Sequence, residues 1–264
     1  MITFTSIELN TWIASFLWPL TRILGLIATA PLFGNISIPT NIKVCFGVAL
    51  AIIIAPSIPG VPGIEPFSLA GILILVQQLI IGAAMGLVVR IAFSAMEMAG
   101  EITGLTMGLG FATFFDPQSQ GRSSAISQLL GLLTLLIYLA ANLHLVLLSV
   151  LADSFISMPI SALPIGAQPL QLFVGWGGRI FSAGIQLSLP IVAALLITNL
   201  ALGILTRAAP QLNLFGIGFP ITICVGFVMI GLVLPYMATP LDRLFQEAFS
   251  IIRQMTINSP QSIQ

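Results

Sequence analysis

Long apolar runs dominate the pattern of this chain. Several stretches contain no Asp, Glu, Lys or Arg and reach the roughly 20 residues that a helix needs to cross a bilayer core; among them are residues 23–42, 44–64, 66–89, 123–152, 180–206 and 208–241. We therefore expect six membrane-embedded helical segments, with cores at residues 12–33, 42–58, 69–92, 126–149, 180–205 and 212–237.

Two further apolar stretches, residues 102–115 and 154–178, are interrupted by Gly and Pro. We expect both to be connecting structure that does not span the membrane. The proline-rich residues 55–63 predict a loop, and residues 158–169 predict a second one.

Three prolines fall inside the expected spans and predict kinks there; they are Pro19, Pro190 and Pro220. The residues after Arg243 are more polar, and we expect them to form a short, frayed tail.

Composition assigns the chain to a class. Of its 264 residues, 58% are hydrophobic and only 6% are charged, whereas a soluble surface needs roughly a quarter charged residues. The eight basic and eight acidic residues balance, so there is no basic field for nucleic acid. The sequence thus predicts an all-α integral membrane protein. Cys45 and Cys224 lie in apolar segments, and we expect them to be buried apolar residues.

Between residues 82 and 108, steps of three and four residues place small and ionisable side chains on one helix face. The residues are Gly82, Gly86, Arg90, Ser94, Glu97, Glu101, Gly104 and Gly108. Small residues at this spacing let membrane helices approach closely, and an Arg can share a buried face with a carboxylate. Two interpretations are open: a helix-packing seam, or the polar lining of a water-filled path.

An aromatic and glycine-rich segment follows this face. It contains Met107, Gly108, Gly110, Phe111, Phe114, Phe115, Asp116 and Pro117. The glycines permit unusual backbone angles, and the Asp-Pro pair stops any helix. Such a hydrophobic loop among membrane helices is either a packing element or a plug across a pore.

A polar turn interrupts the last apolar stretch. It carries Arg207, Pro210, Gln211 and Asn213 between two helical segments. Arg suits buried or interfacial recognition, so this hairpin is a candidate for packing against similar hairpins. Arg22 and Arg179 have no acidic residue nearby in sequence, and we expect them to pair across helices or chains or to reach the interface.

The sequence lacks the common catalytic motifs. It has no His-Glu-x-x-His, no Gly-x-Ser-x-Gly and no phosphate-binding Gly-Lys-Ser/Thr, and its single histidine cannot build a metal site. Glu97 and Glu101 form the only close pair of carboxylates. We therefore expect neither enzymatic activity nor a cofactor or metal.

Two segments, residues 107–118 and 207–222, resemble the FliR family of flagellar biosynthetic proteins, the export-gate family shared with injectisome type III secretion. The Arg-x-Ala-Pro-Gln turn at Arg207 is the most specific element, and Trp18-Pro-Leu-Thr-Arg22 and the proline-rich loop also fit. One departure is Leu143, where the family pattern has a glycine. It weakens any special role for that turn.

The resemblance implies a core subunit of the flagellar protein export channel in the bacterial inner membrane and basal body. One copy would assemble with several FliP-like and FliQ-like subunits and with an FlhB-like protein, and unfolded flagellar proteins would pass. It further implies a FliP-like part at about 1–178, a FliQ-like hairpin at about 180–237 and a polar tail at 238–264. The loop at 106–120 would match the segment that plugs the closed channel.

Two other functions compete with this one. The first is a secondary transporter with an ion path along Arg90, Glu97 and Glu101, but transporters usually show repeated halves, and this sequence shows none. The second is an intramembrane enzyme, for which the sequence offers no nucleophile with its base.

Overall fold

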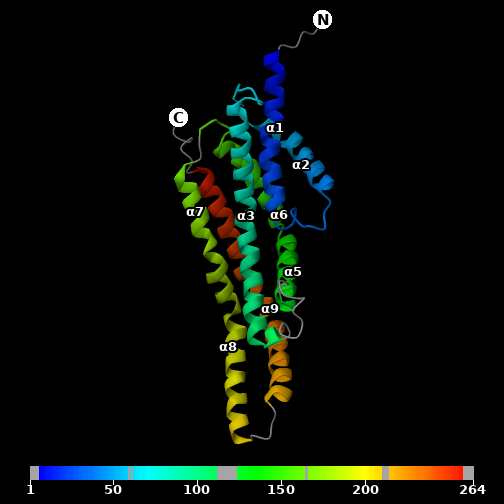
Figure 1. The fold of residues 1–264 in the computed structure, drawn as a ribbon, viewed down its shortest axis with the longest axis vertical. Helices are drawn as coiled ribbons and strands as arrows, with labels where there is room; N and C mark the ends of the chain where they lie inside the picture. Colours follow the sequence, from blue (N-terminus) through cyan, green and yellow to red (C-terminus); the bar gives the residue numbers. More distant parts are fainter. Residues whose placement is uncertain are drawn as a thin grey trace. The chain divides into compact units, whose positions relative to one another are not determined.

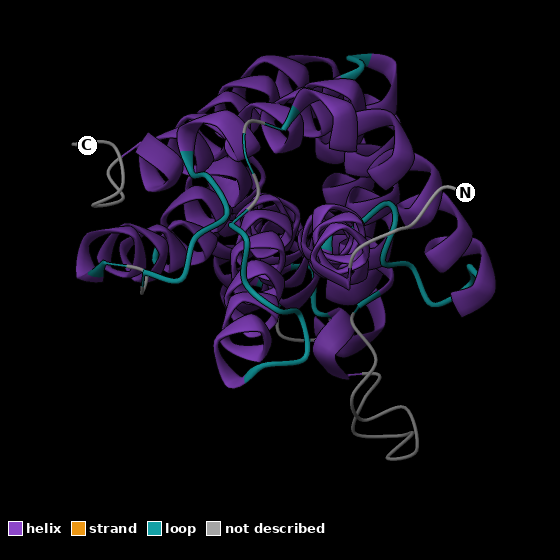
Figure 2. Ribbon diagram, turned by 90° about the horizontal axis from the view of Figure 1, so that it is seen from above, coloured by secondary structure: helices purple, strands orange, loops and turns teal. Residues whose placement is uncertain are grey.

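The computed structural model describes residues 6–58, 60, 62–111, 124–163, 166–209 and 214–257. Every regular element in these ranges is helical (Figure 2). The longer helices are α1 (Ser6–Thr29), α2 (Thr40–Ile54), α3 (Leu69–Thr106), α5 (Ala125–Ala140), α6 (Leu143–Ser157), α7 (Ala167–Gly177), α8 (Arg179–Ala208) and α9 (Phe219–Ile257). Three short turns are η1 (Ala55–Ser57), η2 (Leu109–Phe111) and η4 (Leu214–Gly218). The all-α prediction is confirmed.

The described helices also confirm the expectation of a multi-span membrane protein. Five of them are long and apolar enough to cross a membrane, and the number rises to six if the bent pair α5–α6 counts as one span. The apolar runs form helices because lipid cannot satisfy backbone N–H and C=O groups, which a helix pairs internally.

The expected span over residues 126–149 is present as the bent pair of helices α5 and α6. The chain bends by 67° between α5 and α6. Asn142 at the bend has a φ of 55°, the left-handed conformation that Asn tolerates better than most residues and that a right-handed helix cannot continue. The run contains no charged residue there, so a search for uncharged runs gave no sign of the break.

Several helix limits also differ from the expected ones. Helix α3 continues to Thr106, into the stretch expected to be connecting structure. Helix α7 lies inside residues 154–178, which were expected to be connecting structure; its Pro169 sits in the first turn, where a missing N–H costs little. Pro220 is the second residue of α9 and therefore starts that helix rather than kinking it.

The C-terminal part of α9 replaces the expected frayed tail as far as Ile257. Phe245, Ala248, Phe249 and Ile252 are buried there, and their spacing of three and four residues is that of one helix face. Charged residues on the other face, such as Arg243 and Glu247, hid this amphipathic pattern from a search for uncharged runs.

The chain divides into two compact units, each assembled from separate stretches of sequence. Unit 1 comprises residues 1–91, 142–177 and 245–264, and unit 2 comprises residues 92–141 and 178–244. Within unit 1, α1 lies beside the first part of α3 (Figure 1). Its fully buried large side chains include Trp18, Arg22, Phe155 and Phe249.

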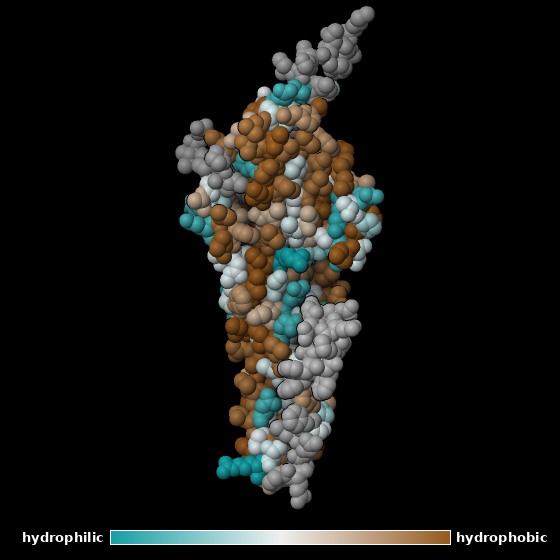
Figure 3. Space-filling view, in the orientation of Figure 1, coloured by the Kyte–Doolittle hydropathy of each residue, from teal (hydrophilic) through white to brown (hydrophobic). Residues whose placement is uncertain are grey.

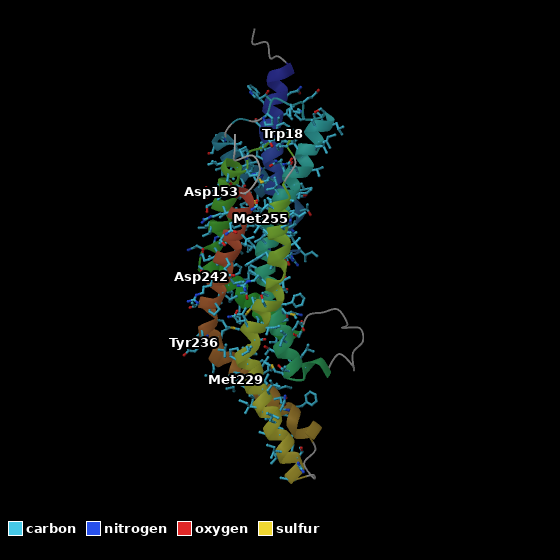
Figure 4. The ribbon with its side chains drawn as sticks, turned by 90° about the vertical axis from the view of Figure 1, so that its left-hand side faces the viewer. Trp18, Asp153, Met229, Tyr236, Asp242 and Met255 are labelled. Carbon is cyan, nitrogen blue, oxygen red and sulfur yellow. The ribbon has the colours of Figure 1, made fainter. Side chains whose placement is uncertain are left out.

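Unit 1 also holds an apolar cavity of about 470 Å³ between α3, α7 and the last turns of α9. Its lining includes Ile81, Met85, Leu170, Phe173 and Met255, and Figure 4 labels Met255 on α9. Carbon dominates this lining, so an apolar group fits the cavity better than a polar solute does.

Unit 2 has its own core, built by parts of α3, α5, α8 and α9. The buried residues are Met96, Ala99, Met107, Ile126, Leu130, Leu187, Ile191, Leu195, Ile230, Met237 and Leu241. Met107 belongs to the segment that follows α3, so the start of this segment is part of the core.

Large apolar side chains also cover much of the visible surface (Figure 3). On α9, Phe227, Val228 and Leu232 are more than half exposed, and Tyr236 is 80% exposed and points outward (Figure 4). Cys45 and Cys224 are exposed as well, so the expectation that they are buried was wrong. Both lie on helix faces that a membrane or another protein chain can cover.

Candidate functional site

The start of the hydrophobic segment is fixed where α3 ends. The N–H of Met107 donates to the carbonyl oxygen of Thr103 at 2.9 Å, and the N–H of Gly108 donates to that of Leu105 at 3.0 Å. Gly108 has a φ of 90°, which a residue with a side chain rarely adopts. The chain therefore leaves α3 through a backbone conformation at Gly108 that only glycine adopts without strain.

The first turns of α9 hold this start in place. The hydroxyl of Thr222 donates to the carbonyl oxygen of Met107 at 3.1 Å, and the Phe219 ring lies so close to Gly108 that a Cβ there would come within 2.7 Å of it. One turn further on, Gly226 leaves room for the Met107 side chain. These contacts form the first anchor of the segment, which we call the Met107 anchor.

A second anchor holds the far end of the segment, at the start of α5. A carboxylate oxygen of Glu101 accepts a 2.7 Å hydrogen bond from the backbone N–H of Ser124. The Ser124 hydroxyl caps α5 by accepting from the N–H of Ser127 at 3.2 Å. The Ser127 hydroxyl donates to the carbonyl oxygen of Glu97 at 2.8 Å. This group is the Glu101 anchor.

Between the anchors, Phe114, Phe115, Asp116 and Pro117 lie outside the described residues. Gly110 and the backbone of Phe111 form the last part of η2. The described part of the segment therefore consists of its two ends, and both ends are tied to helices of unit 2.

The expected glycine face divides between the two units. In unit 1, Gly82 packs against the backbone of Arg22, and Gly86 packs against Thr29 and Ala30, so α1 approaches α3 closely. In unit 2, Gly104 lies against Ser124, where a Cβ would be 3.1 Å from the hydroxyl oxygen. These glycines pack against helices of their own chain.

The ionisable residues of that face are less enclosed. Arg90 and Glu97 are exposed, and Glu101 is half-buried. The carboxylate of Glu101 is used to hold the start of α5, which is a structural task. In the part of the chain that the structure describes, no three His, Cys, Asp or Glu residues gather where they could hold a metal ion.

Arg207 lies exposed in the last turn of α8. Its positive charge there faces the partial negative charge of the helix C-terminus. Pro210, Gln211 and Asn213 lie outside the described residues, so the turn itself stays a prediction.

Arg22 pairs within its own chain. It is fully buried in unit 1. Its guanidinium donates to Gln78, to both oxygens of Ser154 and to the carbonyl of Met158, and it lies 4.3 Å from the centre of the Phe155 ring. The sequence predicts that Arg22 pairs across helices or chains or reaches the interface, and the structure places its partners on α3 and at the end of α6.

Sequence reasoning identified Glu101, Met107 and Gly108 but missed their partners in the anchors, among them Ser124, Phe219, Thr222 and Gly226. For Ser124 a signal existed, because a serine directly before an apolar run is typical of a helix N-cap. For the other three, the contact joins positions more than one hundred residues apart, as with Thr222 and Met107. Local periodicity carries no information on such a pair.

The chain matches a protein-family model described as bacterial export proteins, family 1, over residues 13–248. The flagellar biosynthetic protein FliR of Pectobacterium carotovorum subsp. carotovorum is 43% identical over 252 residues, which cover 96% of each chain. FliR of Escherichia coli (strain K12) is 38% identical over 260 residues, covering 98% of this chain and 99% of that protein. FliR of Buchnera aphidicola subsp. Schizaphis graminum is 37% identical over 230 residues, covering 87% and 89%. The chain belongs to the FliR family of bacterial export proteins.

Proposed function

We propose that this chain, a multi-pass membrane component of the flagellar export apparatus, forms the protein-conducting export gate together with FliP-like and FliQ-like subunits. Membership of the family supports the role in flagellar export. In this proposal the chain is present as one copy in the bacterial inner membrane at the flagellar basal body. An FlhB-like protein adjoins it, and unfolded flagellar proteins pass through the gate.

The observation that carries the proposal is the anchoring of the hydrophobic segment at both ends. A segment that obstructs a pore must be held in position by the surrounding helices, because otherwise it would not stay across the pore. The Met107 anchor ties one end to α9, and the Glu101 anchor ties the other end to α3. We infer that residues 106–120 plug the closed channel, where Phe111, Phe114 and Phe115 make a narrow apolar constriction that water and ions avoid.

The exposed apolar surface of α8 and α9 supports the proposed partners. Towards the Arg207 end of α8, Ile197, Leu200 and Ile204 are each about 70% exposed. A pair of helices that leaves such residues uncovered needs lipid or other helices around it. We propose that this hairpin, at about residues 180–237, stacks with FliQ-like hairpins and that the part at about 1–178 is FliP-like.

The ion-path alternative gains no support from the described residues. The Glu101 carboxylate accepts from the backbone of Ser124, and Arg90 and Glu97 are exposed.

Affinity purification from mild detergent tests the proposal. We expect a tagged chain, expressed together with its neighbouring export genes, to bring down FliP-like and FliQ-like subunits in excess over itself. Native mass spectrometry gives the number of copies of each subunit. A stable, monodisperse monomer that leaves those subunits behind would contradict the proposal.

A further inference from the structure

Unit 2 contains a small cavity in which two arginines meet. It measures about 280 Å³ and lies between α8 and α9. Its polar lining comes from Arg179, Gln186 and Arg243. Its apolar lining comes from Ala183, Leu187, Pro240 and Leu244. Arg179 is half-buried, whereas Gln186 and Arg243 are exposed, so the cavity opens to the surface beside these two residues.

The lining of this cavity suits an anionic group. An arginine keeps its charge, and its planar fork of N–H donors binds phosphate or carboxylate oxygens in pairs. The side-chain amide of Gln186 adds a neutral donor at the opening. Two carboxylates follow closely on α9: Asp242 is rotated about 100° around the helix from Arg243, and Glu247 lies one turn further along the same face. Glu247 thus offsets part of the positive charge, and the two arginines of the cavity outnumber it.

The charge pattern of the two helices puts this cavity at the level of a membrane surface. α8 carries no charged residue between Arg179 and Arg207, and α9 carries none before Asp242. The stretch between the two arginines of α8 is ~40 Å long at about 1.5 Å per residue, which matches the roughly 40–45 Å of a bilayer with its headgroup regions. When this stretch spans the membrane, Arg179 and the neighbouring Arg243 therefore lie among the lipid headgroups.

An exposed apolar strip leads from the cavity along α9. Steps of four, four and three residues place its members on the helix face of the second arginine; they are Leu232, Tyr236, Pro240 and Arg243. Leu232 is 61% exposed and Tyr236 is 80% exposed, and Tyr236 points outward (Figure 4). Tyrosine is typical of the membrane–water interface. A molecule with an anionic head and an apolar chain therefore fits the cavity and the strip together.

We propose that Arg179 and Arg243 bind the phosphate of an anionic phospholipid whose acyl chain lies along Leu232 and Tyr236. A zwitterionic lipid fits less well, because the two guanidinium groups repel its ammonium group. The headgroup level of the cavity and the apolar strip beside it both favour a lipid over the carboxylate of a protein partner. This inference goes beyond the proposed export role, and it does not rest on the hydrophobic segment.

A photo-reactive residue beside the cavity tests the proposal locally. Benzoylphenylalanine replaces Leu232 in the full chain, which is purified with the subunits that accompany it. The preparation is then placed in nanodiscs that contain either dioleoyl-phosphatidylglycerol or dioleoyl-phosphatidylcholine, two lipids with the same acyl chains. Mass spectrometry of this chain after illumination measures the lipid attached at residue 232. We expect phosphatidylglycerol to be attached in preference to phosphatidylcholine.

Loss of either cavity arginine should remove this preference. Arg179→Gln and Arg243→Gln should each lower the affinity for phosphatidylglycerol about ten-fold, which equals ~1.4 kcal/mol and is close to the contribution of one hydrogen bond to a charged group. Attachment of phosphatidylcholine should stay the same. Arg253→Gln is the matched control, because Arg253 is an exposed arginine of the same helix ten residues further on.

A charge at the opening of the cavity gives a test that spares both arginines. Gln186 is exposed, so its replacement leaves the fold intact. Gln186→Glu should lower the attachment of phosphatidylglycerol, and Gln186→Lys should raise it. If the arginines served only to join α8 to α9, these two variants would label alike, and that result would overturn the proposal.

The remaining outcomes separate a lipid from other anions and from the export role. If inorganic phosphate alone raises the thermal midpoint as much as phosphatidylglycerol does, the cavity binds free phosphate and the lipid assignment is wrong. If the arginine variants lose a partner subunit while lipid attachment stays the same, the arginines bind that subunit and the proposal is overturned. Failure of FliP-like and FliQ-like subunits to co-purify would contradict the proposed function, whereas the labelling of this chain would still test the lipid site.

Discussion

The Nε atom of Arg22 donates a 2.7 Å hydrogen bond to Oε1 of Gln78, and this fully buried pair joins α1 to α3 in unit 1. The remaining guanidinium nitrogens donate to Ser154 and Met158 at the end of α6. A helix C-terminus carries unpaired carbonyls and a partial negative charge. The carbonyl groups at the end of α6 therefore accept hydrogen bonds from the positively charged Arg22 inside an otherwise apolar unit.

Replacing Arg22 with Met should destabilise unit 1 strongly. The change leaves Gln78 Oε1 and the Met158 carbonyl without their donor, and each unsatisfied buried group costs about 1–3 kcal/mol. The measurement is the thermal midpoint of the purified complex, together with its yield. Arg90→Met is the control, because Arg90 is an exposed arginine of the same unit. Equal midpoints for the two variants would show that the Arg22 network does not stabilise the protein.

Gly82→Ala should weaken the packing of α1 against α3. The added methyl group overlaps the carbonyl of Arg22, and overpacking of this kind costs about 1–3 kcal/mol. Gly175→Ala on α7 is the matched control in unit 1, since nothing lies within 4 Å of its Cβ position. Limited proteolysis of the two variants gives the comparison. If the two variants resist protease equally, α1 and α3 do not pack as closely as the structure shows.

Removing the Glu101 carboxylate should loosen the start of α5. The N–H of Ser124 loses its acceptor in Glu101→Ala, at a cost of about 1 kcal/mol, typical of a lost helix cap. Hydrogen exchange of the amides at 124–128 should become about five-fold faster. Glu97→Ala removes an exposed carboxylate from the same helix and should leave this exchange unchanged. Identical exchange rates of these amides in Glu101→Ala and Glu97→Ala would show that Glu101 does not hold the start of α5.

Arg207→Ala should reduce the recovery of FliQ-like subunits more than that of FliP-like ones. If the exposed guanidinium becomes buried on assembly, losing it costs roughly 3 to 5 kcal/mol. Arg207→Lys should rescue poorly, because lysine lacks the planar fork of donors. Arg253→Ala, at an exposed arginine of α9, serves as control. Unchanged recovery of every subunit from Arg207→Ala would place this turn in solvent.

Much of the fold could be predicted from the sequence because lipid leaves few choices. Long uncharged runs must be helical, and the runs near residues 69–92 and 180–205 are indeed parts of α3 and α8. The break at Asn142 was missed because one residue in a left-handed conformation does not change the hydropathy pattern. The end of α9 was missed because its charges lie on the face opposite Phe245 and Phe249.

The candidate site could be predicted only in outline. Glycines around residues 104–110 indicated an unusual backbone, and Gly108 has it, with a φ of 90°. The partners of this segment could not be predicted, because Thr222 and Ser124 contact it through tertiary packing. Thr222, which has no unusual local pattern, contributes to the Met107 anchor, whereas Ser124 of the Glu101 anchor carries the N-cap signal of a serine before an apolar run.

Deleting about residues 110–116 and measuring membrane permeability and complex recovery on the same preparation tests the central claim most directly. If the hydrophobic segment is a plug, the complex assembles around the shortened segment and conducts ions at rest, because the apolar constriction is gone. If the segment is a packing wedge, the complex is lost, since each large aromatic removed from a core costs roughly 3 to 5 kcal/mol. An intact complex with unchanged ion permeability would contradict the account.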